Sequence, residues 1–413
     1  MRILIADGNE RAALAAARSL VRAGHDVCVA APTRVSLAGA SRGVRPLRLT
    51  TDPLADPARY AADVGRLLAG EGTDVLLPIT DPSLEAVLEH RAGLPAGVVV
   101  PFADLATYRA ASDKAQVLAL ARECGFGVPE TRVLSGPGTD LPEAAFFPAV
   151  VKPHRSVVTV GRARRKVAVT PVADAAACRR ALAALPRAAF PVLLQRWVAG
   201  AGEGFFALRW GGRTVAAFAH RRLREKPPWG GVSVYRESIP LDEGLVGPGR
   251  RLLDALGWQG VAMIECKREA ATGREILMEV NGRFWGSLQL AIDAGVDFPA
   301  LLVRCAGGET VPENGSYRVG VRSRWFWGDV DHLYLRLRDG RAWGGGGGSR
   351  FGALLAFLRV SRGDSSEVWR WRDPAPFIVE TLQRLGVLTL RTSDARSRSR
   401  AAPIESAPDS GVP

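Results

Sequence analysis

One short stretch, EILMEVNGRFWG at residues 275–286, constrains the fold more than any other part of this sequence. Its apolar run at 276–280 has the length of a buried strand, yet Glu279 lies inside it. Asn281 and Arg283 follow at spacing two, and alternate residues of a strand point to the same face. The pattern therefore predicts a strand that carries an acid, an amide and a guanidinium on one face at its end.

The preceding segment, VAMIECKREAATGR, predicts the partner strand of a hairpin. If REAATGR forms the turn, Glu265 lies opposite Glu279, and side chains in that relation come within about 5 Å. Two carboxylates and the Asn281 amide oxygen suit a hard cation such as Mg²⁺. Without a metal the buried acids would repel and one would take up a proton. The alternative on this spacing alone is a half-buried strand whose acids point to solvent.

Two lysines extend this set of polar groups. Lys152 stands in the short predicted strand FPAVVKP, where an ammonium group needs an anionic partner because burying it unpaired is costly. Lys114 opens a predicted helix that Ser112 or Asp113 can cap, and taken alone it is better explained as a solvated helix charge. Together with Arg283 and the two acids, these lysines suit a magnesium–nucleotide triphosphate.

The first hundred residues alternate between apolar strands and amphipathic helices. RILIA, HDVCVAA, TDVLLPIT and GVVVP are predicted strands, and the helix predicted at DPSLEAVLEHRAGL has Asp81 or Ser83 near its N-cap. Such alternation implies a parallel sheet. The first turn, ADGNER, lacks the GxGxxG pattern, so we predict a structural domain that can line a substrate cleft rather than a dinucleotide site.

Composition excludes several classes of protein. The chain has 413 residues, 47% of them hydrophobic, which allows two or three domains with a full core. The five cysteines form no CxxC pair and the histidines no HExxH motif, so we expect reduced thiols and no zinc site. No signal peptide or membrane-spanning run is recognisable, which predicts a cytoplasmic protein. The net charge of +13 is compatible with nucleotides, nucleic acid or lipid headgroups and does not choose among them.

After about residue 316 the character of the sequence changes. Five tryptophans crowd the next stretch, GGGGGS at 344–349 predicts a flexible insertion, and DPAPFIVETLQRLG predicts a final helix. From about residue 391 large apolar residues are almost absent, so we expect a disordered tail. The sequence assigns no role to the tryptophan-rich part, which could cap a site or form an interface.

In the order of these elements the chain resembles the ATP-grasp superfamily, and within it the carboxylate–amine ligases, over about residues 1–310. The resemblance implies an α/β fold, with α+β character in the ATP-grasp part. Its implied regions are a parallel-sheet pre-ATP-grasp domain at 1–111, an ATP-grasp domain at 112–312 with its lid at about 146–199, a C-terminal extension at 313–390, and the tail at 391–413.

The resemblance also implies a role for each residue at a matching position. Two lysines would contact ATP phosphates, four hinge residues would hold adenine partly through backbone groups, one acid would contact ribose, and two acids with an amide would hold Mg²⁺, or Mn²⁺ as an alternative. An arginine would bind the transferred phosphoryl group or the acyl-phosphate oxyanion, a role that its planar donors also suit. In that order the residues are Lys114 and Lys152; Gln195, Arg196, Trp197 and Val198; Glu203; Glu265, Glu279 and Asn281; and Arg283.

Three departures from the family pattern stand out. Gly282 occupies the place of the usual proline between Asn281 and Arg283. The glycine-rich loop expected after Lys152 is replaced by HRSVVTVGRARRK, which could cover the triphosphate with charge or be a solvated basic hairpin. The ribose contact is ambiguous, because GEGFFAL could put Gly204 rather than Glu203 at the matching position.

Between the hinge and the hairpin lies the basic, turn-rich segment AHRRLREKPPWGGVSVYRESI. Its Arg222 and Arg236 are candidates to bind a carboxylate substrate, and the alternative is an exposed charged loop.

The activity that the resemblance implies is ATP-dependent ligation. A carboxylate is activated as an acyl phosphate, an amine or amino acid displaces the phosphate, and ADP is released. The alternatives are phosphorylation of bicarbonate or carbamate, as in carbamoyl-phosphate synthases, and a non-catalytic nucleotide- or nucleic-acid-binding protein. We expect small-molecule carboxylate and amine partners, neither membrane nor nucleic acid, and leave a homodimer open.

Overall fold

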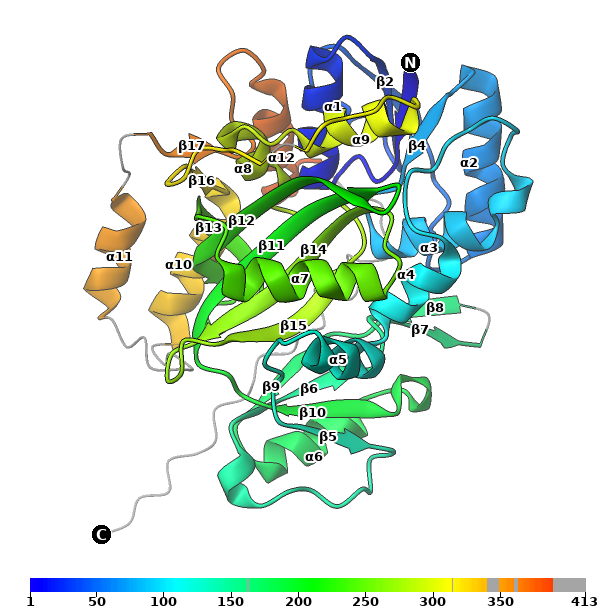
Figure 1. The fold of residues 1–413 in the computed structure, drawn as a ribbon. Coiled ribbons are helices and arrows are strands. Elements are labelled where there is room, and N and C mark those ends of the chain that lie inside the picture. Colours follow the sequence, from blue (N-terminus) through cyan, green and yellow to red (C-terminus); the bar gives the residue numbers. More distant parts are fainter. Residues whose placement is uncertain (162, 314, 340–348, 360–362, 389–413) are drawn as a thin grey trace.

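The computed structural model describes the chain apart from residues 162, 314, 340–348, 360–362 and 389–413. The flexible insertion predicted at 344–349, except its last residue, and the disordered tail predicted from 391 therefore lie outside the described residues. Figure 1 shows an N-terminal α/β unit, a large central sheet, a smaller lid beside it and a C-terminal segment that returns to the N-terminal unit.

The N-terminal unit is a parallel sheet in the order β3-β2-β1-β4, as the alternation predicted. The predicted fourth strand GVVVP is reduced to a single bridge between Val75 and Val99. The helix after β4 is capped by Thr80, which accepts a hydrogen bond from the Ser83 backbone N–H, while the Ser83 hydroxyl accepts from the Thr80 backbone N–H. Asp81 and Ser83 thus lie next to the N-cap, as predicted. The elements are β1 (Arg2–Ile5), α1 (Arg11–Arg22), β2 (Asp26–Ala31), β3 (Val44–Arg48), α2 (Pro57–Glu71), β4 (Val75–Leu77), α3 (Asp81–Glu89) and a 3₁₀ turn (Arg91–Gly93).

Two helices, α4 (Leu105–Ser112) and α5 (Lys114–Glu123), lead from this unit into the lid. Asp113 caps α5 by accepting from two backbone N–H groups, which confirms one of the two predicted caps. The lid is an antiparallel sheet in the order β5-β10-β6-β9 with its own small apolar core, and the hairpin β7–β8 lies beside it. Its elements are β5 (Thr131–Leu134), β6 (Ala149–Pro153), β7 (Val157–Val160), β8 (Ala163–Lys166), β9 (Thr170–Val172), α6 (Ala175–Ala183) and β10 (Val192–Arg196), with 3₁₀ turns at Ala144–Phe146 and Arg187–Ala189.

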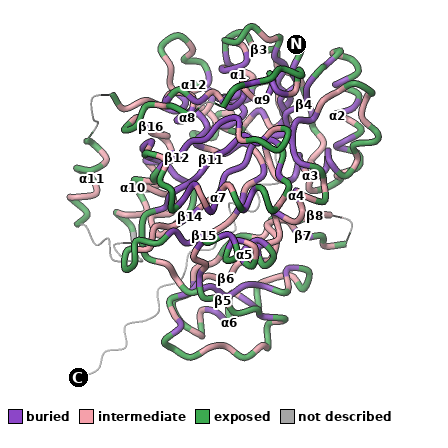
Figure 2. The backbone as a smooth tube through the Cα atoms, in the orientation of Figure 1, coloured by how far each residue is buried: buried purple, intermediate pink, exposed green. Residues whose placement is uncertain are grey.

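The central sheet has the order β15-β14-β11-β12-β13-β16-β17 and shares one large apolar core with the N-terminal unit. Its strands β11 and β12 are buried along much of their length (Figure 2). Helix α7 covers one face, where a side chain at Gly249 would collide with the Phe205 ring. At one end the opposite face is covered by the segment leading into α8, through Trp285 on Phe206, and the rest of that face forms a cleft wall. The elements are β11 (Gly200–Trp210), β12 (Arg213–Lys226), β13 (Val232–Ser238), α7 (Glu243–Ala255), β14 (Gly260–Glu269), β15 (Glu275–Asn281), α8 (Leu288–Ala294) and α9 (Phe298–Ala306).

The C-terminal segment is joined to both larger units. Its first strand pairs with β13, and its later part reaches α1, where Asp373 accepts from Arg18 at 2.8 Å and Glu367 accepts from Arg11 at 2.5 Å. The Arg11 guanidinium also lies 3.8 Å from the centre of a Trp325 ring. The elements are β16 (Arg322–Arg324), α10 (Phe326–Asp339), α11 (Arg350–Leu358), β17 (Ser365–Ser366) and α12 (Ala375–Arg384). Among the described residues, each helix is too short or too polar to span a membrane.

Candidate functional site

The hairpin of β14 and β15 has the predicted register. Glu265 pairs directly with Glu279, and Asn281, two residues beyond, pairs with Met263. Because residues paired across a sheet share a face, both carboxylates and the amide project to the same side, which confirms the predicted arrangement. A bulge follows Glu265, so the match between the strands shifts beyond the acid pair.

The two acids have different surroundings. The Oε2 atom of Glu265 lies 2.6 Å from the Arg222 guanidinium, whereas Glu279 accepts a hydrogen bond of 3.0 Å from the Asn281 amide and lies 4.0 Å from the Lys114 ammonium. Burial raises the pKa of Glu265, and Glu279 adds to this although Arg222 opposes it. Burial also works against the charged form of Glu279, but Lys114 and the Asn281 hydrogen bond prevail and its pKa lies below the ordinary value.

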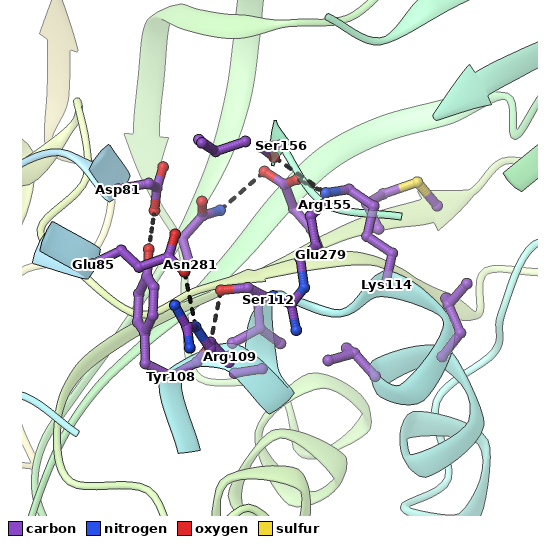
Figure 3. A pocket seen from close by; sticks show the side chains of 16 residues that line it. Asp81, Glu85, Tyr108, Arg109, Ser112, Lys114, Arg155, Ser156, Glu279 and Asn281 are labelled. Atoms are coloured by element: carbon purple, nitrogen blue, oxygen red, sulfur yellow. Dashed lines mark hydrogen bonds and ion pairs between the residues drawn. The ribbon is translucent and has the colours of Figure 1, made fainter. Parts of the chain in front are cut away.

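Both candidate lysines lie close to this acid pair. Lys114 is buried at the start of α5 and donates to the Ser156 hydroxyl at 3.2 Å, so it is not the solvated helix charge that was the alternative (Figure 3). Lys152 lies on β6, and burial lowers the pKa of its ammonium to about 8, although the nearby Glu279 opposes the shift. Both therefore supply positive charge at the acid pair, and Lys152 does so without a close ion pair to any residue that the structure describes.

Arg283 is held by a residue that the sequence did not single out for the site. Its Nη2 lies 2.9 Å from an Asp81 carboxylate oxygen and 3.3 Å from the Asn281 amide oxygen. Asp81 also accepts from the Tyr108 hydroxyl at 2.9 Å. Burial opposes the charged form of Asp81, but Arg283 lowers its pKa below the ordinary value. A signal was available, because Asp81 follows a buried strand of a parallel sheet near its carboxyl end, where ligand sites in α/β folds lie.

These groups face a cleft of about 570 Å³ between the lid and the central sheet. A second, smaller pocket shares Glu279 and Asn281 with it and is lined by Lys114, Ser156 and Asp81 (Figure 3). Besides Glu279 and Asn281, eight of the predicted site residues line the cleft: Lys152, Gln195, Arg196, Trp197, Val198, Arg222, Glu265 and Arg283.

The predicted hinge residues form one wall of this cleft. Gln195 on β10 is buried and donates to the Thr131 hydroxyl at 3.3 Å, and within the described part of the chain its amide oxygen has no partner. Lys267 donates to the Val198 carbonyl at 2.9 Å and lies over the Trp197 ring at 4.6 Å. The wall thus combines a flat aromatic ring with an unsatisfied acceptor, which suits a purine that carries an amino group.

Two predicted residues line neither the cleft nor the smaller pocket. Glu203 points to the opposite face of the sheet from Glu265, where it lies 3.4 Å from Arg268, because β11 pairs Gly204 rather than Glu203 with Glu265. Arg236 is fully buried, donates to the Ser233 carbonyl and forms an ion pair with Glu367. The C-terminal segment that supplies Glu367 was too distant in sequence to indicate this pairing.

The basic segment at 154–166 forms the hairpin β7–β8. Arg164 is ion-paired with Glu89 of the N-terminal unit and donates its backbone N–H to the Leu54 carbonyl at 2.7 Å. Arg155 lines the smaller pocket, and Arg162 lies outside the described residues. The segment that carries Arg222 is also part of a strand, since β12 continues to Lys226. It is therefore not the exposed charged loop that was the alternative.

Gly282, the departure from the family proline, has a neighbour that explains it. A Cβ atom built there would lie 2.3 Å from the Trp258 ring and 3.2 Å from the Tyr108 ring. Trp258 is buried and donates its indole N–H to the Val261 carbonyl. Its ring therefore occupies the space that any side chain at residue 282, proline included, would need.

The donor set fits a hard cation more than a transition metal. No group of three or more His, Cys, Asp or Glu side chains converges in the described part of the chain. Two carboxylates and one amide oxygen would leave coordination positions for phosphate oxygens and water, as Mg²⁺ commonly requires beside nucleotides.

Comparison with known proteins shows which sequences and folds this chain resembles. Residues 206–327 match the family model described as "ATP-grasp in the biosynthetic pathway with Ter operon". No curated protein matches the sequence. Similar solved structures include an L-amino acid ligase from Bacillus licheniformis, with 17% identity over 74% of this chain and 73% of the ligase and a TM-score of 0.56.

Two further structures are similar at the level of the fold. Biotin carboxylase from Campylobacter jejuni is 14% identical over 78% of this chain and 74% of its own, with a TM-score of 0.58. N5-carboxyaminoimidazole ribonucleotide synthetase from Thermus thermophilus is 16% identical over 77% of this chain and 81% of its own, with a TM-score of 0.53. The chain therefore has the ATP-grasp fold.

The packing at Gly282 leads to a prediction about stability. Gly282→Ala should lower the melting temperature by a few degrees, because overpacking a core position costs about 1–3 kcal/mol. In a Trp258→Leu background the same substitution should cost less than half as much, since the colliding ring is gone. Thermal melting of the four proteins of this double-mutant cycle measures the difference, and an equal cost in both backgrounds would contradict the explanation.

Proposed function

We propose that this ATP-grasp protein is an ADP-forming carboxylate–amine ligase. The observation that carries the proposal is the pairing of Glu265 with Glu279 at one end of a cleft, with Lys152 and Arg283 beside them. Opposed carboxylates surrounded by cations suit a metal-bound triphosphate, and phosphoryl transfer depends mainly on such positioning and charge neutralisation.

Glu265, Glu279 and Asn281 would hold Mg²⁺, which when bound neutralises charge on the phosphates. Lys114 and Lys152 would contact the triphosphate, and the Gln195–Val198 wall would receive adenine. The unpartnered Gln195 oxygen supports this, because a buried acceptor without a donor is costly unless a ligand supplies one. Glu203 takes no part, since it faces away.

The carboxylate substrate would lie between the guanidinium groups of Arg222 and Arg283. The ion pair with Asp81 holds the Arg283 guanidinium in place before substrate binds. A hydrogen-bond donor positioned in advance in this way stabilises the charge that develops in the transition state. Arg222 now pairs with Glu265, and its planar donors can exchange that carboxylate for one from the substrate or share the two.

The reaction has two steps. A substrate carboxylate oxygen forms a bond to the γ-phosphorus while the bond from that phosphorus to the β–γ bridging oxygen breaks, giving ADP and an acyl phosphate. An amine nitrogen then bonds to the acyl carbon, the carbon–oxygen bond to phosphate breaks, and amide and phosphate leave. The residues of this chain position the groups and balance their charge. A GxSxG pattern occurs at residues 39–43, but its Ser41 hydroxyl donates to Asp373 at 2.6 Å and does not line the cleft, so we assign it no role as a nucleophile.

The cellular setting follows from the same proposal. The reaction uses ATP, and all five cysteines are buried and unpaired, which fits a reducing cytoplasm. The similarity in fold to an L-amino acid ligase supports amino acids as the first substrates to test, and the similarity to biotin carboxylase supports bicarbonate as a competing phosphoryl acceptor.

The test of this function is ADP release with pooled common amino acids, which offer both carboxylates and amines, and with bicarbonate alone in parallel. Excess hydroxylamine converts an acyl phosphate into a stable hydroxamate, so ATP-dependent hydroxamate is the expected product. Glu279→Gln and Arg283→Ala should each lower its rate by about 10²–10³-fold while melting temperature and circular dichroism stay near wild type.

The matched controls are Glu309→Gln and Arg304→Ala, a half-exposed ion pair at the C-terminal end of α9 that should change nothing. Near-normal turnover by Glu279→Gln or Arg283→Ala would contradict the roles proposed for these residues in the site. ADP release with bicarbonate and none with amino acids would replace amide ligation by bicarbonate phosphorylation.

The pKa of Lys152 leads to a pH prediction. With a pKa of about 8 in the free protein, its ammonium is charged below pH 8 and loses its proton above it. Affinity for MgATP should therefore fall between pH 7 and pH 9 by up to about tenfold, the loss expected one unit above the pKa. Calorimetric titration at both pH values should show this fall in wild type and a weaker, flatter affinity in Lys152→Met. A Lys152→Met protein with the full pH dependence would exclude Lys152 as its source.

A further inference from the structure

A single row of residues crosses the central sheet at the acid pair. In register order it runs Glu279, Glu265, Gly204 and His220, on strands β15, β14, β11 and β12. All four share one face, and two strand spacings separate the backbones of Glu265 and His220 by about 10 Å. His220 is therefore near the place where a metal-bound phosphate would lie, yet the function proposed above does not use it.

The glycine between them makes room for a neighbouring aromatic ring. A Cβ atom at Gly204 would lie 2.8 Å from the Phe206 ring and 3.4 Å from the His220 ring, and one at Gly202 would lie 2.8 Å from Arg222. A side chain at either position would displace these neighbours. Two glycines at alternate positions of β11 thus let Phe206 and Arg222 pack directly on the backbone between the acids and His220.

Two buried polar groups at this end of the cleft have no hydrogen-bond partner among the described residues. His220 is 1% exposed and neither ring nitrogen makes a hydrogen bond, and the indole nitrogen of Trp285, 2% exposed, is equally unpartnered. Both residues line the cleft. Buried groups of this kind are normally satisfied, so a pair of them facing one cavity indicates polar groups of a ligand.

The walls and charges here define which ligand fits. The Phe206 ring contacts both His220 and Trp285, with centroid distances of 4.7 and 4.4 Å. Burial, together with Arg222 and Arg236, holds the pKa of His220 well below its ordinary value, so the ring is neutral and offers one acceptor nitrogen and one donor. These two arginines disfavour a bound cation and favour an amine in its uncharged, nucleophilic form.

We propose that the pocket between His220 and Trp285 binds the amine substrate, and that His220 accepts a hydrogen bond from the attacking nitrogen. This rests on the ligase function proposed above and names the place of its second substrate. The amine would stand across Gly204 from the acid pair, so that its lone pair faces the acyl carbon held near Glu265 and Arg283.

The step balances without another reactant. The lone pair of the neutral amine forms the carbon–nitrogen bond, the carbon–oxygen bond to phosphate breaks, and the proton shed by the nitrogen leaves with the phosphate. His220 orients the nitrogen and keeps its own protonation state.

The experiment compares two products from the same acyl phosphate. Pooled common amino acids are supplied with ATP, and dipeptide formation is measured by mass spectrometry without hydroxylamine and hydroxamate with excess hydroxylamine. Hydroxylamine is small and strongly nucleophilic, so at high concentration it attacks the acyl phosphate without needing a shaped pocket.

His220→Phe keeps the ring in contact with Phe206 and removes the acceptor. It should lower the dipeptide rate by about 100-fold and change the hydroxamate rate by less than about twofold. His220→Gln, which restores a polar side chain of similar reach, should recover part of the dipeptide rate. Arg221→Ala is the matched control, because Arg221 is the next residue on β12 but points to the other face and pairs with Glu237.

Each outcome decides something. A selective loss of dipeptide supports the amine site. An equal loss of both products overturns it, because His220 would then serve acyl-phosphate formation or the fold, and two unchanged rates would make His220 a packing residue. Wild-type protein that forms no hydroxamate would instead refute the ligase function on which the inference rests.

Discussion

The rest of this structure depends on one register, the alignment that sets Glu265 opposite Glu279 in the β14–β15 hairpin. Two unit charges about 5 Å apart repel by about 3 kcal/mol at an effective dielectric constant near 20. The fold can keep such a pair buried when cations surround it. Lys114 comes from the helix before the lid, Lys152 from the lid itself and Arg222 from the neighbouring part of the central sheet. The acid pair thus explains why segments distant in sequence bring positive charge to one end of the cleft.

Each part of the chain contributes differently to that end. The N-terminal unit supplies Asp81, which fixes Arg283, and the C-terminal segment supplies Glu367, which pairs with Arg236 behind the cleft wall. Arg11 of α1 shares Glu367, so the first and last segments meet directly behind the site. The tryptophan-rich extension, which had no assignable role from sequence, therefore supports the site from behind and does not cap it in the described residues.

What could be predicted from the sequence was local. Period-two spacing placed Glu279 and Asn281 on one face, and the hairpin turn then placed Glu265 opposite, because both follow from strand geometry over about twenty residues. Glu203 was suggested by the resemblance alone, and Gly204 stands opposite Glu265 instead, so Glu203 lies on the other face of the sheet. Arg236, Asp81 and Gly282 depend on contacts with residues far away in the chain, namely Glu367, Arg283 and Trp258, and no local pattern encodes those. His220 lies in the basic segment between hinge and hairpin, and no sequence pattern shows that both of its ring nitrogens lack a partner among the described residues.

The central claim is that the opposed carboxylates hold a metal-bound triphosphate. The most direct measurement is a crystal structure of the wild-type protein with Mn²⁺ and a non-hydrolysable ATP analogue, using the anomalous signal of manganese. The account predicts a peak between Glu265 and Glu279, within roughly 2.0–2.3 Å of oxygens from both, with Arg222 moved from Glu265 and the γ-phosphate near Lys152. A nucleotide bound elsewhere, or an acid pair that keeps its contacts with Arg222 and Lys114 while manganese binds at another place, would contradict it.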